Sequence, residues 1–110
     1  MSKYHSKKVT VHGITFDSKK EAERYRQLKL LEMAGKIKEL ELQVKFVLQP
    51  SFKKNGKTIR AITYVADFEY YDVAKGKYIV EDVKGYKTKE YQLKKKMFEY
   101  RYPDQTIVEV

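Results

Sequence analysis

The chain has 110 residues, of which 24 are Lys or Arg and 15 are Asp or Glu, so its formal net charge is +9. This excess of positive charge favours a polyanionic partner, most often nucleic acid, rather than a small-molecule substrate. The sequence contains no cysteine, which excludes a disulfide scaffold, a thiolate zinc site and catalysis by a cysteine nucleophile.

The length is sufficient for one hydrophobic core but not for two domains. Residues 1–7 are polar and basic, which predicts a flexible tail before a single domain at residues 8–110. No apolar run approaches the roughly 18 residues of a membrane span, and the start lacks the apolar stretch of a signal peptide. We therefore expect a cytoplasmic protein without a membrane partner.

The first part of the chain predicts a hairpin and a helix. Apolar residues flank His12-Gly13, where glycine supplies the positive φ of a tight turn, so residues 9–16 predict two short strands. Ser18 and Glu21 match a capping box, and Gly35 is a typical helix stop, which together predict a helix over residues 19–34. Its expected buried stripe consists of Ala22, Tyr25, Leu28 and Leu31.

The hydrophobic period then changes to two, which is typical of strands. An Asn55-Gly56 turn and a second turn at residues 72–76 separate the first three of these strands, and Gly85 ends the third. The expected strands span residues 40–48, 58–71, 77–84 and 106–110.

Thr88 is placed to cap a second helix at residues 89–100, whose apolar residues Leu93, Met97 and Tyr100 are expected on one face. The resulting order is ββ-α-βββ-α-β. This order predicts an α+β fold, in which two helices flank a central mixed sheet.

Acidic residues interrupt two of the apolar strands. Asp82 follows Glu81 within the strand at residues 77–84, and Asp67 lies in the preceding strand. An unpaired buried carboxylate is costly, so each acid needs a compensating group. Because side chains alternate along a strand, Asp82 and Lys84 are expected to project on the same face.

Pairing of the two strands about the turn at residues 72–76 would place positions whose numbers sum to about 149 opposite each other, including Asp67 and Asp82. Two close carboxylates repel each other unless one is protonated or a cation lies between them. Ligation by oxygen alone suits Mg²⁺ or Mn²⁺. The alternative is a plain surface pair of acids at frayed strand ends.

Two further polar residues have two interpretations each. Glu21 is explained by the capping box, yet it shares the helical stripe of Tyr25 and Leu28, where a third metal ligand would have to point. Gln43 lies on the polar side of its strand, where it is either solvated or directed at the candidate site.

Several segments together resemble a known nuclease superfamily. They are Phe16-Asp17-Ser18-Lys19-Lys20-Glu21-Ala22, the strand of Gln43, Tyr64-Val65-Ala66-Asp67-Phe68 and Glu81-Asp82-Val83-Lys84-Gly85. This set is similar to the PD-(D/E)XK nucleases, and more closely to a small phage and prophage family of candidate endonucleases long described as a domain of unknown function. Ala66 stands where the superfamily motif has proline, which is a geometric aid and not a ligand.

The resemblance implies a restriction-endonuclease-like core and phosphodiester hydrolysis that depends on Mg²⁺, with Mn²⁺ as a substitute. If the roles of the superfamily's motif residues apply to this chain, Glu21, Asp67 and Asp82 would bind the metal, and Lys84 would orient water or stabilise negative charge. Gln43 and Glu81 are candidates for supporting these residues, although alternation favours Asp82 over Glu81.

Basic residues at the second helix are expected to follow DNA phosphates, the alternative being an ordinary solvated helix face. These candidate DNA-binding residues are Lys87, Thr88, Lys89, Lys94, Lys95 and Lys96. The leading hypothesis is a homodimeric endonuclease selective for branched DNA, as in Holliday-junction resolution, in phage recombination or replication within a bacterial cell. The alternatives are a noncatalytic DNA-binding accessory protein and a basic protein-interaction module.

Overall fold

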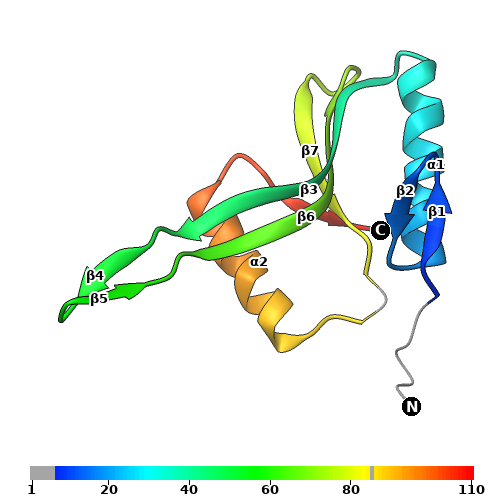
Figure 1. Cartoon of the computed structure of the whole chain (residues 1–110). Helices are drawn as coiled ribbons and strands as arrows, with labels where there is room; N and C mark the ends of the chain where they lie inside the picture. The colour runs from blue at the N-terminus through cyan, green and yellow to red at the C-terminus, as the bar shows by residue number, and fades with distance from the viewer. Residues whose placement is uncertain (1–6, 85) are drawn as a thin grey trace.

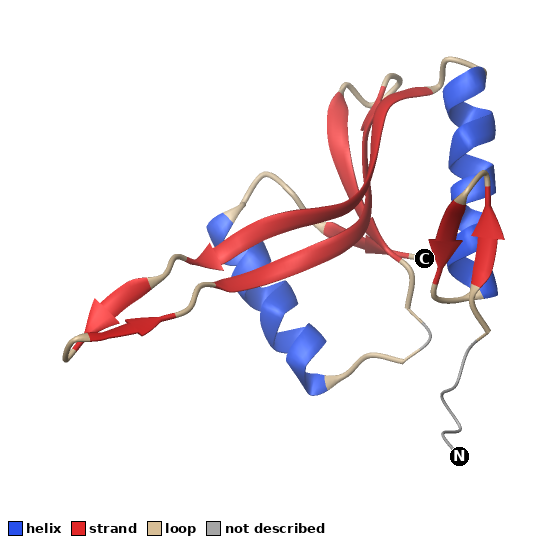
Figure 2. Cartoon of the chain, viewed as in Figure 1, coloured by secondary structure: helices blue, strands red, loops and turns tan. Residues whose placement is uncertain are grey.

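The computed structural model describes residues 7–84 and 86–110 and shows an α+β fold (Figures 1 and 2). Within these residues, a central mixed sheet is accompanied by two helices, as the sequence predicts. The elements are β1 (Val9–Val11), β2 (Ile14–Phe16), α1 (Lys19–Met33), β3 (Ile37–Gln49), β4 (Phe52–Lys54), β5 (Lys57–Ile59), β6 (Ile62–Asp72), β7 (Lys77–Asp82), α2 (Lys89–Arg101) and β8 (Ile107–Glu109).

The central sheet has the strand order β3-β6-β7-β8. Strand β6 is antiparallel to both β3 and β7, whereas β7 and β8 are parallel, which makes the sheet mixed. Phe68 pairs with Glu81 and Asp72 pairs with Lys77, so the predicted sum of 149 is confirmed. This register places Asp67 and Asp82 at the point where β6 and β7 separate.

The predicted helix boundaries are confirmed by their caps. The Ser18 hydroxyl accepts a hydrogen bond of 3.1 Å from the backbone N–H of Glu21, and Thr88 caps α2 by accepting one of 3.0 Å from Tyr91. Gly35 follows α1 with a φ of 75°, a conformation that glycine adopts without a steric penalty. These caps fix the start of each helix beside the end of β7.

Two apolar clusters lie on the two faces of β7, and its alternation divides them. The first cluster joins β7 to α1 and the second joins β7 to α2. The buried members of the first are Val11, Phe16, Ala22, Tyr25, Leu28, Ile37, Phe68, Tyr70 and Ile79. The buried members of the second are Leu48, Tyr64, Ala66, Val80, Tyr91, Phe98 and Ile107.

Strand β6 changes from one cluster to the other along its length. Tyr64 and Ala66 belong to the cluster of α2, whereas Phe68 and Tyr70, at positions of the same parity, belong to the cluster of α1. The change therefore falls at Asp67. Such a change within one strand requires a strong local twist of the β3–β6 ribbon, because side chains of one parity otherwise share a face.

The predicted buried face of the second helix is wrong for Leu93 and Tyr100, whereas Met97 is partly buried against the second cluster as expected. Leu93 and Tyr100 are exposed, at 59% and 89% of their surface, while Tyr91 and Phe98 are buried. Tyr91 and Phe98 are seven residues apart, so they lie on the same helix face and direct two aromatic rings at the sheet. Leu31 of the expected α1 stripe is 37% exposed, so it lies at the margin of the buried face of this helix.

The strand predicted at residues 58–71 is interrupted, and β4 and β5 form a separate hairpin. Pro50 lacks an N–H for the ladder, and the pairing between β3 and β6 ends at this level. Figure 1 shows the β4–β5 hairpin extending from the body at the tip of the β3–β6 ribbon. Residues 1–6 of the predicted tail, and Gly85, lie outside the described residues.

Neither helix in residues 7–84 and 86–110 combines the length and apolar character needed to cross a membrane.

Candidate functional site

Three carboxylates from three elements lie near one another where β6 and β7 separate. We refer to Glu21 of α1, Asp67 of β6 and Asp82 at the end of β7 as the acidic cluster. Glu21 and Asp82 are buried, at 7% and 2% exposure, and Asp67 is half-buried. Lys84 lies two residues after the end of β7 and contacts Asp82, so the structure brings together all four residues that the sequence predicts for the site.

Asp82 is held by two donors. The Tyr64 hydroxyl donates a hydrogen bond of 2.7 Å to Asp82 Oδ2, and Lys84 Nζ lies 3.0 Å from the same oxygen. The Lys84 ammonium also lies 4.0 Å from the centre of the Tyr91 ring, in a cation–π contact. Burial, together with the hydrogen bond to Asp82, raises the pKa of Tyr64, so its hydroxyl stays a donor. Lys84 is thereby fixed between an acid and an aromatic face.

Asp67 carries the clearest electrostatic signal of the site. Burial raises the pKa of Asp67 to about 8, with a smaller contribution from the adjacent Asp82 carboxylate. The backbone N–H of Val83 opposes this rise by donating a hydrogen bond of 2.8 Å to Asp67 Oδ2. Negative charge at this position is therefore disfavoured unless a cation compensates it.

Gln43 connects the other two acids. Its Nε2 lies 3.3 Å from Glu21 Oε2 and 3.5 Å from Asp67 Oδ1, so its amide lies between the two carboxylates. The backbone of Gln43 has a φ of 53°, which costs a non-glycine residue roughly 1 to 2 kcal/mol. Of the two interpretations of Gln43, the structure favours the one in which its side chain faces the candidate site.

Glu21 also faces the site. Its backbone N–H donates to the Ser18 cap while its carboxylate is buried near Gln43, so both interpretations of Glu21 from the sequence hold in the structure. Burial raises the pKa of Glu21, and repulsion from Asp17 and Asp82 adds to the rise, which the Asp17 backbone N–H and Lys84 oppose. Asp82 and Lys84 thus act on Glu21 electrostatically.

The donor chemistry of the acidic cluster fits a hard divalent cation, because carboxylate oxygens are the ligands that Mg²⁺ and Mn²⁺ prefer. Within the described part of the chain, however, no group of three or more His, Cys, Asp or Glu side chains is arranged so that it could hold a metal ion. The contacts agree with this finding, because the Gln43 amide separates Glu21 from Asp67 and the Lys84 ammonium pairs with Asp82.

Glu81 lies on the opposite face of β7 from Asp82. Arg24 Nε donates a hydrogen bond of 2.7 Å to Glu81 Oε1, and Arg24 Nη2 donates one of 2.5 Å to Glu81 Oε2. The same Oε2 also accepts a hydrogen bond from the Tyr70 hydroxyl. Glu81 is 1% exposed. This bidentate pair joins α1 to β7, so the structure assigns Glu81 to holding the helix and not to the acidic cluster.

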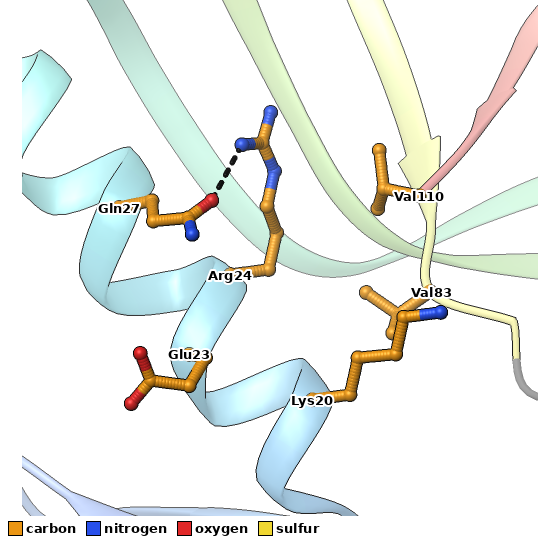
Figure 3. Close-up of a pocket in the computed structure, with 6 residues that line it drawn as sticks. All are labelled: Lys20, Glu23, Arg24, Gln27, Val83 and Val110. Atoms are coloured by element: carbon orange, nitrogen blue, oxygen red, sulfur yellow. Dashed lines mark hydrogen bonds between the residues drawn. The ribbon is translucent and has the colours of Figure 1, made fainter.

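A pocket of about 200 Å³ lies beside this connection, and Figure 3 shows the side chains that line it. Arg24 donates a hydrogen bond of 2.9 Å to Gln27, and Lys20 extends toward the chain at Val83. Lys20 Nζ donates a hydrogen bond of 3.0 Å to the Lys84 carbonyl. Helix α1 therefore holds the segment that carries Lys84 as well as supplying Glu21.

A second pocket, of about 300 Å³, opens from Asp82 and Lys84 toward the start of α2. Its lining combines both site residues with the N-cap of the helix, and it consists of Thr63, Tyr64, Val65, Asp82, Lys84, Thr88, Glu90, Tyr91 and Lys94. The N-terminus of a helix carries partial positive charge. The pocket therefore holds the positive helix start, Lys84 and Lys94, together with the two acids that pair with these lysines, Asp82 and Glu90.

Most of the candidate DNA-binding lysines are paired with acids of the chain. Lys87 lies 2.8 Å from Glu109, Lys94 lies 3.4 Å from Glu90, and Lys95 lies 3.8 Å from Glu109. Their charges are partly compensated within the protein. The pair of Lys94 with Glu90 has the i,i+4 spacing of a helix, whereas the sequence could not reveal the pairs with Glu109, which lies on β8. A phosphate would have to compete with these acids for the lysines, so each lysine should attract it less strongly than an unpaired lysine would.

The remaining candidates of this set differ from one another. Thr88 uses its hydroxyl to cap α2. Lys89 and Lys96 are exposed, and neither forms an ion pair within the described part of the chain. Lys89 and Lys96 are therefore the residues of α2 whose positive charge is most available to a polyanion.

Sequence reasoning missed the residues that position the site. Tyr64, Tyr91, Arg24 and Lys20 each contact a site residue or its neighbour from a distant part of the chain. No local pattern marks such contacts. The unusual number of tyrosines, 10 in 110 residues, is the signal that could have suggested hydroxyl partners for buried acids.

The fold and the site define an α+β protein with a partly buried acidic cluster and an adjacent lysine. The chain belongs to the family described as "Protein of unknown function (DUF1064)", whose model matches residues 1–109. A comparison with curated proteins and one with solved structures each found no match.

Proposed function

We propose that the chain is a metal-dependent endodeoxyribonuclease of the PD-(D/E)XK type. The observation that carries this proposal is the meeting of Glu21, Asp67, Asp82 and Lys84 at the end of β7. Three acids share a single lysine at this position, and burial raises the pKa of Glu21 and Asp67. In a protein of net charge +9, such a gathering of acids supports a cation site beside a surface that attracts DNA.

Asp67, Asp82 and Glu21 would hold the ion, which would be Mg²⁺ with Mn²⁺ as a substitute, after the Gln43 amide and the Lys84 ammonium move from their present positions between the acids. When bound, a divalent cation lowers the pKa of a coordinated water and neutralises charge on the phosphate. Asp67 supports this assignment, because burial beside Asp82 makes its charged form unfavourable without a positive partner. Gln43 supports the site by contacting two of the proposed ligands.

Lys84 is the residue that stabilises negative charge on the phosphate in the transition state. Its ammonium is held by Asp82 at 3.0 Å and by the ring of Tyr91, and it lines the pocket that leads to α2. Tyr64 keeps Asp82 oriented by donating to the oxygen that Lys84 also contacts. These contacts limit the freedom of both groups, which favours catalysis by fixed charges.

Lys89 and Lys96 of α2 would contact the DNA backbone, with Lys87, Lys94 and Lys95 contributing where a phosphate displaces their acidic partners. The homodimer, the preference for branched DNA and a role in phage recombination or replication within the bacterial cytoplasm rest on the sequence resemblance. The same applies to the restriction-endonuclease-like description of the core.

A cleavage assay on junction, flap and linear DNA of equal sequence tests the proposal. With Mg²⁺ or Mn²⁺ we expect the protein to cut junction or flap DNA faster than linear DNA, and we expect no cutting in EDTA. Asp82→Asn is the matched control, because it removes the charge with little change of shape. A folded protein that binds DNA but cuts no substrate with either metal would contradict the nuclease proposal.

The second candidate function is a noncatalytic DNA-binding accessory protein. One observation favours it: the acids are satisfied without a metal, Asp82 by Lys84 and both Glu21 and Asp67 by Gln43. This candidate predicts DNA binding that is unaffected by Mg²⁺ and unchanged by Asp82→Asn. Calorimetric titration with Mn²⁺ separates the two functions, since only the nuclease requires a bound ion.

A further inference from the structure

The β4–β5 hairpin is the most exposed part of the described chain. We call residues 50–61, which contain β4 and β5, the basic arm. Every residue of the basic arm is exposed, and its strands pair only with each other. A two-stranded hairpin without a packed face is only marginally stable in water, so this arm gains little from folding by itself. Its projection from the body instead suits contact with a partner (Figure 1).

The charge of this region has one sign. Between Glu41 and Asp67 the sequence contains no acidic residue. Over the same stretch it contains five basic residues, four of them within the basic arm; they are Lys45, Lys53, Lys54, Lys57 and Arg60. No ion pair within the described part of the chain involves any of the four. The basic arm therefore differs from α2, where acids compensate several lysines.

The pairing of the two strands concentrates this charge. Lys54 and Lys57 are directly opposite each other, and like charges in this position repel. Alternation places Phe52 and Ile59, the next pair on the same face, beside them. An anion between Lys54 and Lys57 would remove the repulsion, which makes a polyanion the partner that the charge favours over a basic or neutral surface.

The length of the ribbon sets where this partner would be contacted. Along β5 and β6, Lys57 lies ten residues before Asp67, which corresponds to about 33 Å of extended chain. One turn of duplex DNA measures about 34 Å. A duplex held at the acidic cluster and lying along the β3–β6 ribbon would thus meet the basic arm about one helical turn away.

We propose that the basic arm binds the phosphate backbone of DNA about one helical turn from the acidic cluster. This inference rests on the proposed function for the identity of the polyanion and for the position at which DNA is cut. It adds a second contact surface, separate from α2, that extends the bound length of the duplex.

Binding to duplexes of two lengths tests the proposal. The arm variant is Lys53→Gln/Lys54→Gln/Lys57→Gln, and the matched control is Lys36→Gln/Lys75→Gln/Lys77→Gln, which removes the same charge from exposed lysines at the other end of the ribbon. For a duplex of about 30 base pairs, we expect the arm variant to bind about tenfold or more weakly. Its salt slope should fall by about 0.9 for each phosphate that the arm no longer neutralises. The control should change affinity less than threefold.

A short duplex of about 10 base pairs cannot span both surfaces, so the arm variant and the unmodified protein should differ less on it than on the long duplex. Equal losses for the arm and control variants would overturn the proposal, because net charge alone would then explain binding. An unchanged affinity of the arm variant for the long duplex would also overturn the proposal.

The two proposals fail in different ways. DNA binding that needs the arm, without cleavage, would contradict the nuclease function and leave the arm as a DNA-binding element. Cleavage that is insensitive to the arm variant on long and short DNA alike would leave the nuclease function intact and remove the arm from it. Absence of any DNA binding by the folded protein would contradict both.

Discussion

Glu81 and Asp82 are neighbours on β7, and each is buried against one cation and one tyrosine hydroxyl, yet their surroundings differ. Glu81 faces α1, where the Arg24 guanidinium and the Tyr70 hydroxyl satisfy both of its oxygens. Asp82 lies on the opposite face, where Lys84 and the Tyr64 hydroxyl contact one of its oxygens and where two further acids, Glu21 and Asp67, lie nearby. The difference is therefore the presence of additional acids beside Asp82, because each of the two residues already has a cation. We infer that Glu81 serves the fold and that Asp82 serves a ligand.

Replacement of Lys84 should have the largest effect on activity. Lys84→Gln removes the cation proposed to stabilise the transition state, so we expect the cleavage rate with Mg²⁺ to fall by about 10³-fold. Binding of Mn²⁺ should be retained or tightened, because the ammonium no longer competes at Asp82. Single-turnover cleavage and calorimetric titration measure the two effects. A full cleavage rate in this variant would remove Lys84 from the chemistry.

Breaking the pair of Glu81 should have the largest effect on stability. Arg24→Met leaves the Glu81 carboxylate buried without its cation, which we expect to lower the free energy of unfolding by about 3 kcal/mol. Urea denaturation measures this loss. The double variant Arg24→Met/Glu81→Gln should recover more than half of it, since no uncompensated charge remains. Equal stability of the single variant and the unmodified protein would show that this pair does not hold the helix.

Removing an acid of the acidic cluster should raise the stability of the protein, whereas breaking the pair of Glu81 lowers it. Asp67→Asn removes one of the repelling carboxylates, so we expect it to raise the free energy of unfolding in EDTA by about 1 kcal/mol. The same variant should lose the stabilisation that Mg²⁺ gives the unmodified protein, which is about 1.4 kcal/mol at an ion concentration ten times the Kd. Destabilisation in EDTA would indicate that Asp67 is compensated within the fold, as Glu81 is.

The lysines of α2 also divide into residues with and without acidic partners in the described part of the chain, and this difference should change DNA affinity by a smaller factor. Lys89→Gln/Lys96→Gln removes two charges that have no acidic partner among residues 7–84 and 86–110, so we expect DNA affinity to fall by about three- to tenfold at low salt. Lys87→Gln/Lys95→Gln should cost less, because Glu109 already compensates these residues. Fluorescence anisotropy with labelled duplex compares the two variants. A larger loss for the second pair would contradict the distinction between free and compensated lysines.

Much of the fold could be predicted because its signals are local. Ser18, Gly35 and Thr88 mark helix ends by their own side-chain and backbone preferences, and the structure shows the caps. The turn before β7 set the register that brings Asp67 opposite Asp82. Because side chains alternate along β7, the sequence alone placed Asp82 and Glu81 on opposite faces of the strand.

What could not be predicted depends on contacts between distant residues. Arg24 and Glu81 are 57 residues apart in sequence, and nothing local to either indicates the pair. The left-handed backbone of Gln43 is equally hidden, since non-glycine residues seldom adopt it and its sequence context is that of a regular strand. The buried face of α2 was not predicted correctly because apolar residues occur on both sides of the helix. In the structure, the face that carries Tyr91 and Phe98 is the buried one.

Binding of Mn²⁺ to three proteins tests the central contrast most directly. Calorimetric titration should show one ion-dependent binding event in the unmodified protein and in Glu81→Gln, and none in Asp82→Asn, with circular dichroism confirming that all three are folded. Both variants convert a buried acid of β7 to its amide, so they differ only in which face they change. Binding that survives Asp82→Asn, or is absent from the unmodified protein, would contradict the assignment of the acidic cluster to a metal ion.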